Sequence, residues 1–181
     1  CSDGLLTIME KLKVKKVIIS KQGETSENYE KFLEIAKQNN IKILMVKSGD
    51  KIKIEKDIYF DILFPEEKQI QENMLNNNSV VAKLVYKKFS LLFTGDIEEI
   101  AEKRILEKYK NSDILKSTVL KVAHHGSKSS SIQEFLNAVS PRIALIGVGK
   151  NNKFGHPSDT TIHALNAINC NIYRTDENGE I

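Results

Sequence analysis

The pattern of apolar positions in the first 46 residues alternates between the period of a helix and that of a strand. A first helix is predicted by apolar residues at helical spacing, namely Leu5, Leu6, Met9 and Leu12. The run Val17-Ile18-Ile19 predicts a strand, and a second helix, with Ser26 as its N-cap, precedes a strand over 41–46. This rhythm is typical of a parallel sheet with crossover helices.

The middle of the chain has the pattern of an antiparallel sheet. Apolar runs there predict four strands, at 52–54, 58–64, 79–86 and 89–93. The dipeptide Lys87-Lys88 separates the last two strands and indicates a hairpin. A polar loop that ends in three asparagines, Asn76-Asn77-Asn78, precedes that hairpin.

The last third alternates helices and strands again. Its helices are predicted over 97–110, 132–139 and 160–168, and its strands over 119–123, 142–148 and 171–174. No internal repeat, low-complexity segment or linker interrupts the sequence. We therefore expect one α/β domain over 1–181.

Composition and charge narrow the class of protein only slightly. The 181 residues fit one domain or a large part of one, and 40% apolar and 28% charged residues are typical of a globular chain. A net charge of +3 gives a weak preference for an anionic partner. Cys1 and Cys170 lie at opposite ends without metal-type spacing, and no apolar run reaches the roughly 20 residues that span a bilayer. The missing initiator methionine leads us to expect a piece of a longer protein.

Asp96 is the first candidate for chemistry. It follows Gly95 directly after the apolar strand that contains Leu91-Leu92-Phe93. A carboxylate at the end of a strand, next to a glycine that allows close backbone approach, suits a metal ligand or a general base. The alternative is an N-cap for the helix that begins at Ile97, a role that aspartate fills well.

A histidine pair follows the next apolar strand, in the motif His124-His125-Gly126-Ser127. Neighbouring residues on an extended backbone point to opposite sides, so only one imidazole should face a given metal unless the chain bends there. The other imidazole could then contact substrate or hold the loop. The alternative is a polar pair on a surface turn.

A third motif, Gly155-His156-Pro157, lies beside Lys150 and Lys153, as Lys121 and Lys128 lie beside the histidine pair. If these loops converge, imidazoles, hydroxyls and ammonium groups surround one anionic position. That combination favours phosphate chemistry over peptide or sugar chemistry. His163 falls inside a predicted helix, so we expect it to be structural.

Five motifs in this order resemble those of the metallo-β-lactamase superfamily and, within it, the hydrolase-like domain of the ComEC family of DNA-uptake (competence) proteins. The motifs are Asn78-Ser79, the strand end at 92–96 with Glu102 after it, 121–127, 149–157, and Arg174-Thr175-Asp176 with Gly179. The resemblance runs along nearly the whole chain. It implies a metallo-β-lactamase-like αββα sandwich, incomplete at its N-terminal side.

The resemblance also implies roles for individual residues. Asp96 would bridge two divalent metals, zinc or manganese, and one of the paired histidines, His125, would be a further ligand. His124 and His156 would be catalytic residues. The expected substrate-binding residues are Asn78, Ser79, Ser127, Lys128 and Asn152. A metal-bound hydroxide would then attack a phosphodiester.

One departure from the family pattern changes these expectations. The superfamily's main ligand cluster, histidine-x-histidine-x-aspartate-histidine, is absent, and no histidine precedes His124. The segment Cys1-Ser2-Asp3-Gly4-Leu5 resembles the small glycine-rich step that follows this cluster in the family. We therefore expect the chain to begin just downstream of the cluster, to bind metal weakly, and to hydrolyse little or nothing by itself. The missing strands should leave an exposed sheet edge that favours self-association.

Three hypotheses follow. The first is a fragment of a metal-dependent nuclease or phosphodiesterase of a DNA-internalisation protein, a soluble domain attached to a membrane-channel portion of the same parent on the extracytoplasmic rather than the cytoplasmic face. The second is a hydrolase of a cell-wall or lipid phosphodiester. The third is a metal-free binding or assembly module. A ligand cluster encoded before Cys1 would favour the enzymes, and its absence would favour the module.

Overall fold

The computed structural model describes residues 2–21 and 27–180 and groups them into two compact units with separate apolar cores. The first unit is Cys1–Val46 and the second is Lys47–Ile181. The single domain expected over 1–181 stays a prediction, since two units with separate cores can still fold as one domain.

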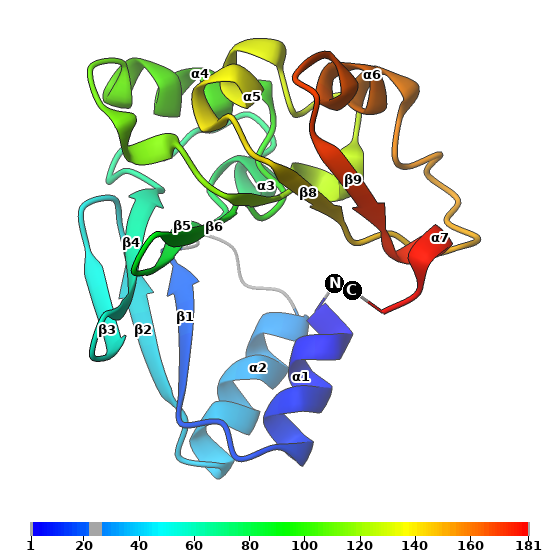
Figure 1. The fold of residues 1–181 in the computed structure, drawn as a ribbon. Coiled ribbons are helices and arrows are strands. Elements are labelled where there is room, and N and C mark those ends of the chain that lie inside the picture. The colour runs from blue at the N-terminus through cyan, green and yellow to red at the C-terminus, as the bar shows by residue number, and fades with distance from the viewer. Residues whose placement is uncertain (1, 22–26, 181) are drawn as a thin grey trace. The chain divides into compact units, whose positions relative to one another are not determined.

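The first unit contains two helix–strand pairs, as the apolar pattern predicted. Its elements are α1 (Ser2–Lys11), β1 (Lys16–Ser20), α2 (Glu27–Gln38) and β2 (Lys42–Val46). The two strands pair in parallel, with Val17 opposite Ile43, and α1 and α2 lie side by side (Figure 1). Leu6 and Met9 pack with Phe32 and Ile35 in the core between these elements. The predicted cap Ser26, like Cys1, lies outside the described residues.

The second unit is built on a seven-stranded sheet in which the strands lie in chain order. They are β3 (Lys51–Glu55), β4 (Ile58–Phe64), β5 (Val81–Tyr86), β6 (Phe89–Phe93), β7 (Val119–Lys121), β8 (Ile143–Ile146) and β9 (Asn171–Arg174). β3 to β6 pair antiparallel, whereas β6 to β9 pair in parallel. The predicted antiparallel middle is confirmed, and the alternating strands and helices of the last third form the parallel part of the sheet.

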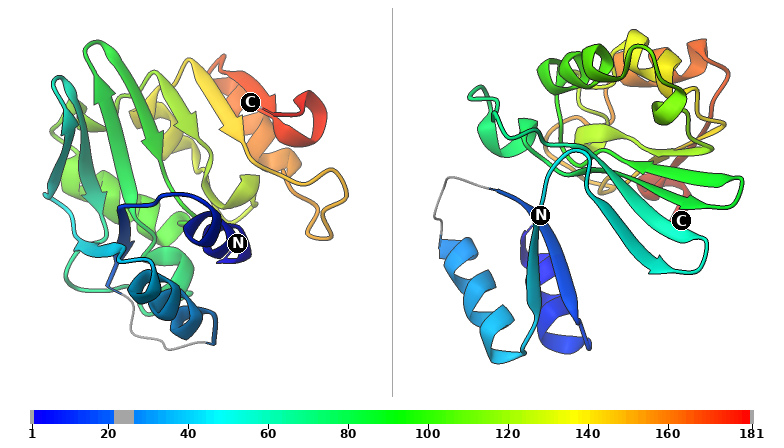
Figure 2. Two further views of the ribbon diagram at one scale, coloured as in Figure 1. Left: turned by 90° about the horizontal axis from the view of Figure 1, so that it is seen from below. Right: turned by 90° about the vertical axis from the view of Figure 1, so that its left-hand side faces the viewer.

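Three helices cover one face of this sheet (Figures 1 and 2). They are α4 (Glu99–Tyr109), α5 (Gln133–Val139) and α6 (Asp159–Ala167). Their apolar sides, with Ile105, Phe135 and Leu165, pack on the strand residues Leu92 and Leu120. Short helical turns complete the unit, namely α3 (Met74–Asn77), the 3-10 turns η1 (Asp113–Leu115) and η2 (Ala123–Gly126), and α7 (Thr175–Asn178).

The sheet of the second unit has two edge strands, β3 and β9. Lys51 and Lys53 lie on β3, and charged residues on an edge strand hinder pairing with another chain. These lysines act against self-association through β3, and self-association through a sheet edge stays a prediction. No helix within residues 2–21 and 27–180 combines the length and the apolar content that a bilayer crossing requires.

Candidate active site

The parallel strands of the second unit place the three motif loops at one edge of the sheet. Phe93 of β6 lies opposite Lys121 of β7, and Lys121 lies opposite Leu145 of β8. Parallel strands point their carboxyl ends the same way, so the loops that follow them meet. The motif loops therefore do converge, and Asp96, both paired histidines and His156 gather there.

Asp96 is fixed by a close contact between the backbone at Gly95 and Ser79. Gly95 has a φ of +55°, and a Cβ built on it would lie 2.6 Å from the Cβ of Ser79. The backbone N–H of Asp96 donates a hydrogen bond of 3.3 Å to the Ser79 hydroxyl, and Lys121 Nζ donates to the carbonyl of Gly95 over 3.2 Å. The alternative role of Asp96 as a helix cap is wrong, because α4 begins at Glu99 after Glu98.

The chain bends sharply at the histidine pair. Both His124 (φ 47°, ψ 42°) and His125 (φ 56°, ψ 22°) have left-handed backbone conformations. A non-glycine residue in this conformation costs about 1 kcal/mol or more, and such strain concentrates at functional sites. The two rings lie 6.5 Å apart with 64° between their planes. On an extended strand the two side chains would point to opposite sides. Because the chain bends here, both imidazoles border the same site.

His125 faces Asp96 with one ring nitrogen and is held by the other. Nδ1 lies 2.6 Å from the carbonyl oxygen of Gly147, and a carbonyl only accepts, so Nδ1 donates its proton there. In the neutral ring Nε2 then carries the lone pair, and it lies 3.8 Å from Oδ1 of Asp96. Two electron-rich atoms that face each other favour a cation between them. Histidine ligands of metals are oriented in this way by a backbone carbonyl.

His124 lies beside the buried carboxylate of Glu98, a residue that no sequence motif had indicated. Its Nδ1 is 3.4 Å from Oε1 of Glu98, without hydrogen-bond geometry, so this buried nitrogen has no hydrogen-bond partner in the part of the chain that the structure describes. Glu98 itself accepts hydrogen bonds from Asn73 at 2.7 Å and Ser129 at 3.3 Å. A buried carboxylate held by two hydrogen bonds therefore lies directly beside the imidazole of His124.

His156 is placed by the amide of Asn152. The Asn152 Oδ1 accepts from the backbone N–H of His156 at 2.9 Å, and its Nδ2 donates to the His156 carbonyl at 2.8 Å. The His156 ring lies 5.9 Å from that of His124. Partial burial lowers the pKa of His156, and the neighbouring His124 and His125 lower it further. His156 is therefore a neutral imidazole at neutral pH.

The other predicted substrate-binding residues differ in how far they are exposed. Asn78 is 2% exposed, and its amide makes three hydrogen bonds to the backbone of Ile70 and Met74. Ser127 is 6% exposed and its hydroxyl pairs with that of Ser129 at 3.0 Å. Both side chains hold loops in this structure, whereas Lys128 is exposed. Contact of any of them with substrate stays a prediction.

Glu102 fixes the serine-rich loop that follows the histidine pair. Its fully buried carboxylate accepts from the backbone N–H groups of Ser131 at 2.7 Å and Ile132 at 2.9 Å. Burial raises the pKa of Glu102 to about 7, although these two hydrogen bonds act in the opposite direction. Glu102, the acidic residue of the second motif, therefore holds the loop from below and is not exposed in the site.

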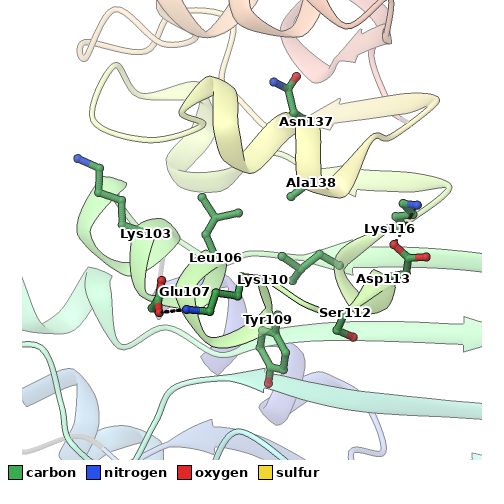
Figure 3. Close-up of a pocket in the computed structure, with 11 residues that line it drawn as sticks. Lys103, Leu106, Glu107, Tyr109, Lys110, Ser112, Asp113, Lys116, Asn137 and Ala138 are labelled. Atoms are coloured by element: carbon green, nitrogen blue, oxygen red, sulfur yellow. Dashed lines mark hydrogen bonds and ion pairs between the residues drawn. The ribbon is translucent and has the colours of Figure 1, made fainter.

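Two hollows in the second unit differ in their position along the strands. One, of about 310 Å³, lies at the histidine end and is lined by His125, Gly147, Val148, Gly149, Asn152, Phe154 and His156. The other, of about 510 Å³, lies between α4, η1 and α5, before β7 begins (Figure 3). Its lysines are paired with neighbouring carboxylates, as Lys110 is with Glu107 at 2.6 Å, so it offers no excess charge to an anion.

The residues present supply only part of a metal site. Asp96 and His125 are two suitable ligands, but within the described residues no group of three or more histidine, cysteine, aspartate and glutamate side chains could hold a metal ion. Zinc takes four ligands in structural sites and at least three from the protein in catalytic sites. The pair therefore fits as a portion of a ligand set and falls short of a complete one.

Comparisons with known proteins match most of the chain. It is 36% identical over 169 residues to ComE operon protein 3 of Bacillus subtilis. The matched region is 93% of this chain and 21% of that protein. It is 35% identical over 122 residues to Competence protein ComA of Neisseria gonorrhoeae, or 67% of this chain and 17% of that protein. No family model matches the chain.

A solved structure shows the fold. A protein from Parabacteroides distasonis, named as a metal-dependent hydrolase, superposes with a TM-score of 0.52 over 93% of this chain and 79% of its own, at 12% identity. With the large mixed sheet, this confirms the expected metallo-β-lactamase-like α/β class. The chain belongs to the ComEC family of competence proteins and spans about a fifth of the length of the curated relatives it matches.

Proposed function

We propose that this chain is part of a metal-dependent phosphodiesterase domain that acts on DNA for a competence protein. The observation that carries the proposal is the pair formed by Asp96 and His125, 3.8 Å apart at the carboxyl ends of parallel strands. The names of the relatives support a competence role, and the name of the structural neighbour supports metal-dependent hydrolysis.

Asp96 and His125 would contribute to the binding of two divalent ions, zinc or manganese. Such ions supply a hydroxide at neutral pH and stabilise the charge that develops on the phosphate. The two side chains are ready for this role, because the Gly147 carbonyl fixes the tautomer of His125 and Ser79 fixes the backbone at Asp96. Since residues 2–21 and 27–180 offer no third donor beside these two, we propose weak metal binding and little or no hydrolysis by the chain alone.

The remaining residues of the site would act on protons and on the phosphate. His124, with the Glu98 carboxylate 3.4 Å from its Nδ1, would transfer a proton during the reaction. His156 is neutral at neutral pH and can donate one N–H to a phosphate oxygen. Lys128 and Lys150 are exposed near these loops and attract a polyanion.

The setting of the domain is also a proposal. The parent would carry a membrane-channel portion, and this domain would lie on the extracytoplasmic face, where incoming DNA arrives. A competing function, a metal-free binding or assembly module, is favoured by one observation, the incomplete ligand set among the described residues.

Cleavage assays separate these functions. This chain and a longer form that includes upstream sequence are incubated with Mn²⁺ or Zn²⁺ and with DNA, a glycerophosphodiester or a teichoic-acid phosphodiester. We expect DNA cleavage by the longer form, and its loss in Asp96→Ala. Equal cleavage by the wild type and Asp96→Ala contradicts the metal site. Cleavage of only the other substrates identifies a different phosphodiesterase, and DNA binding without any cleavage supports the module.

A further inference from the structure

Among the residues that the structure describes, Phe154 is the large apolar side chain with the greatest exposure to solvent. It is 82% exposed, against 42% for Phe89 and 36% for Phe93. A phenylalanine in water forgoes the stabilisation that its burial would give. It lies on the loop from Gly149 to His156, beside the candidate site, and the proposed hydrolysis gives it no role.

The loop that presents Phe154 is held in place. Asn152 accepts from the backbone N–H groups of Phe154 at 3.2 Å and His156 at 2.9 Å, and it donates to the carbonyls of Gly149 at 3.1 Å and His156 at 2.8 Å. One amide thus closes the loop on itself. An exposed aromatic ring in a fixed position is preorganised for binding, because little conformational freedom remains to be lost.

The exposed ring of Phe154 contacts the imidazole rings of the site through His156. It stacks on the imidazole of His156, with 6.0 Å between the centroids and 18° between the planes, and His156 in turn lies 5.9 Å from His124. The hollow of about 310 Å³ between Phe154, His156 and His125 is at the lower end of the range for ligand pockets. A flat ring can enter next to the position proposed for the phosphate.

The positive charge around Phe154 favours flat ligands that also carry negative charge. Lys150 and Lys153 are exposed on the same loop, and neither forms an ion pair with the described residues. A ligand that combines a flat ring with negative charge on either side complements this surface. Nucleotides of a nucleic acid have both features, and proteins bind single strands through aromatic stacking and lysine–phosphate contacts.

We propose that Phe154, stacked on His156, forms a subsite for one nucleobase of single-stranded nucleic acid, with Lys150 and Lys153 on the flanking phosphates. The inference rests on the proposed function and makes its substrate more specific. In a duplex both faces of an internal base are covered by its neighbours, so only a single strand or a strand end can offer a free face. The subsite therefore favours single-stranded DNA over duplex DNA.

Binding of oligonucleotides tests the subsite without any need for turnover. Affinities are measured by fluorescence anisotropy, without added metal, for a labelled oligothymidylate and for an abasic strand of equal length. We expect the wild type to prefer the strand with bases, and Phe154→Ala to weaken its binding about tenfold while the abasic strand is unaffected. Phe89→Ala, another exposed phenylalanine, is the matched control and should leave both affinities unchanged.

A tryptophan at the same position gives a direct readout. The sequence contains no tryptophan, so Phe154→Trp introduces a single indole, and stacking of a base on it should quench the tryptophan emission. Equal affinity of the wild type for both strands, or no effect of Phe154→Ala, overturns the subsite and leaves the proposed function standing. If the wild type binds neither strand, the nucleic-acid function itself is contradicted.

Discussion

Gly95→Ala tests the contact that fixes Asp96. The added methyl group would lie 2.6 Å from the Cβ of Ser79, and the residue would keep a φ of +55°. The left-handed conformation costs an alanine about 1 kcal/mol, and overpacking in a filled space costs about 1–3 kcal/mol. We therefore expect the free energy of unfolding of the second unit to fall by about 2–4 kcal/mol.

Urea denaturation followed by far-UV circular dichroism measures this loss. Two further variants separate the cost of the backbone conformation from the cost of the contact with Ser79. Gly155→Ala is the matched control, because Gly155 has a φ of +69°, near that of Gly95, and an added Cβ meets nothing within 4 Å. It should show the conformational part alone. Ser79→Gly removes the opposing Cβ, so the double variant with Gly95→Ala should recover about 1–3 kcal/mol relative to the sum of the single variants.

The result that would refute this reasoning is a loss in Gly95→Ala no larger than in Gly155→Ala, with no coupling to Ser79→Gly. The backbone at Gly95 would then not depend on Ser79. Asp96 would lack the support that the proposed metal site requires of it.

Three further predictions concern stability and binding. The pKa of Glu102 rises from 4.5 to about 7 on folding, so its stabilising contribution, roughly 3 kcal/mol, is present below pH 4.5 and lost as pH rises through 7. Urea unfolding at pH 5 and pH 8 should show this loss in the wild type and not in Glu102→Gln. Asn152→Ala should speed trypsin cleavage after Lys150 and Lys153, whereas Asn137→Ala, on an exposed position of α5, should not. DNA affinity should fall steeply with salt, since phosphate contacts release counterions, and an affinity insensitive to salt would contradict the role of these lysines.

The order of the elements could be predicted from the sequence, and each motif could be placed at the end of a strand. Each element in the second unit's sheet coincides with an apolar run, and the strands of the last third are linked by helices, which forces a parallel arrangement. Thr94-Gly95-Asp96 and the histidine pair both follow such strands, but the sequence supported their convergence only as a condition. In the first unit, Leu5 and Leu12 share the helical spacing of the buried Leu6 and Met9 but remain exposed, because periodicity alone does not set the width of a buried face.

Other parts of the site depend on tertiary contacts that no local pattern reveals. The left-handed bend at His124 and His125 is held by partners such as the Gly147 carbonyl and the Gly95 carbonyl, which accepts from the His124 N–H. Glu98 was missed because Asn73 and Asn77, which donate to it, lie in a polar loop without periodicity. A second acidic residue two positions after Asp96 was the only signal in the sequence.

Metal binding by the chain tests the central claim most directly. Titration with Mn²⁺, followed by the electron paramagnetic resonance signal of the free ion, is compared for the wild type, Asp96→Ala, His125→Ala and the control His163→Ala, whose histidine is exposed on α6. If Asp96 and His125 form one portion of a metal site, the wild type and the control bind the ion weakly and equally, and both site variants lose this binding. Equal affinity in all four proteins, or no binding in any of them, would contradict the account.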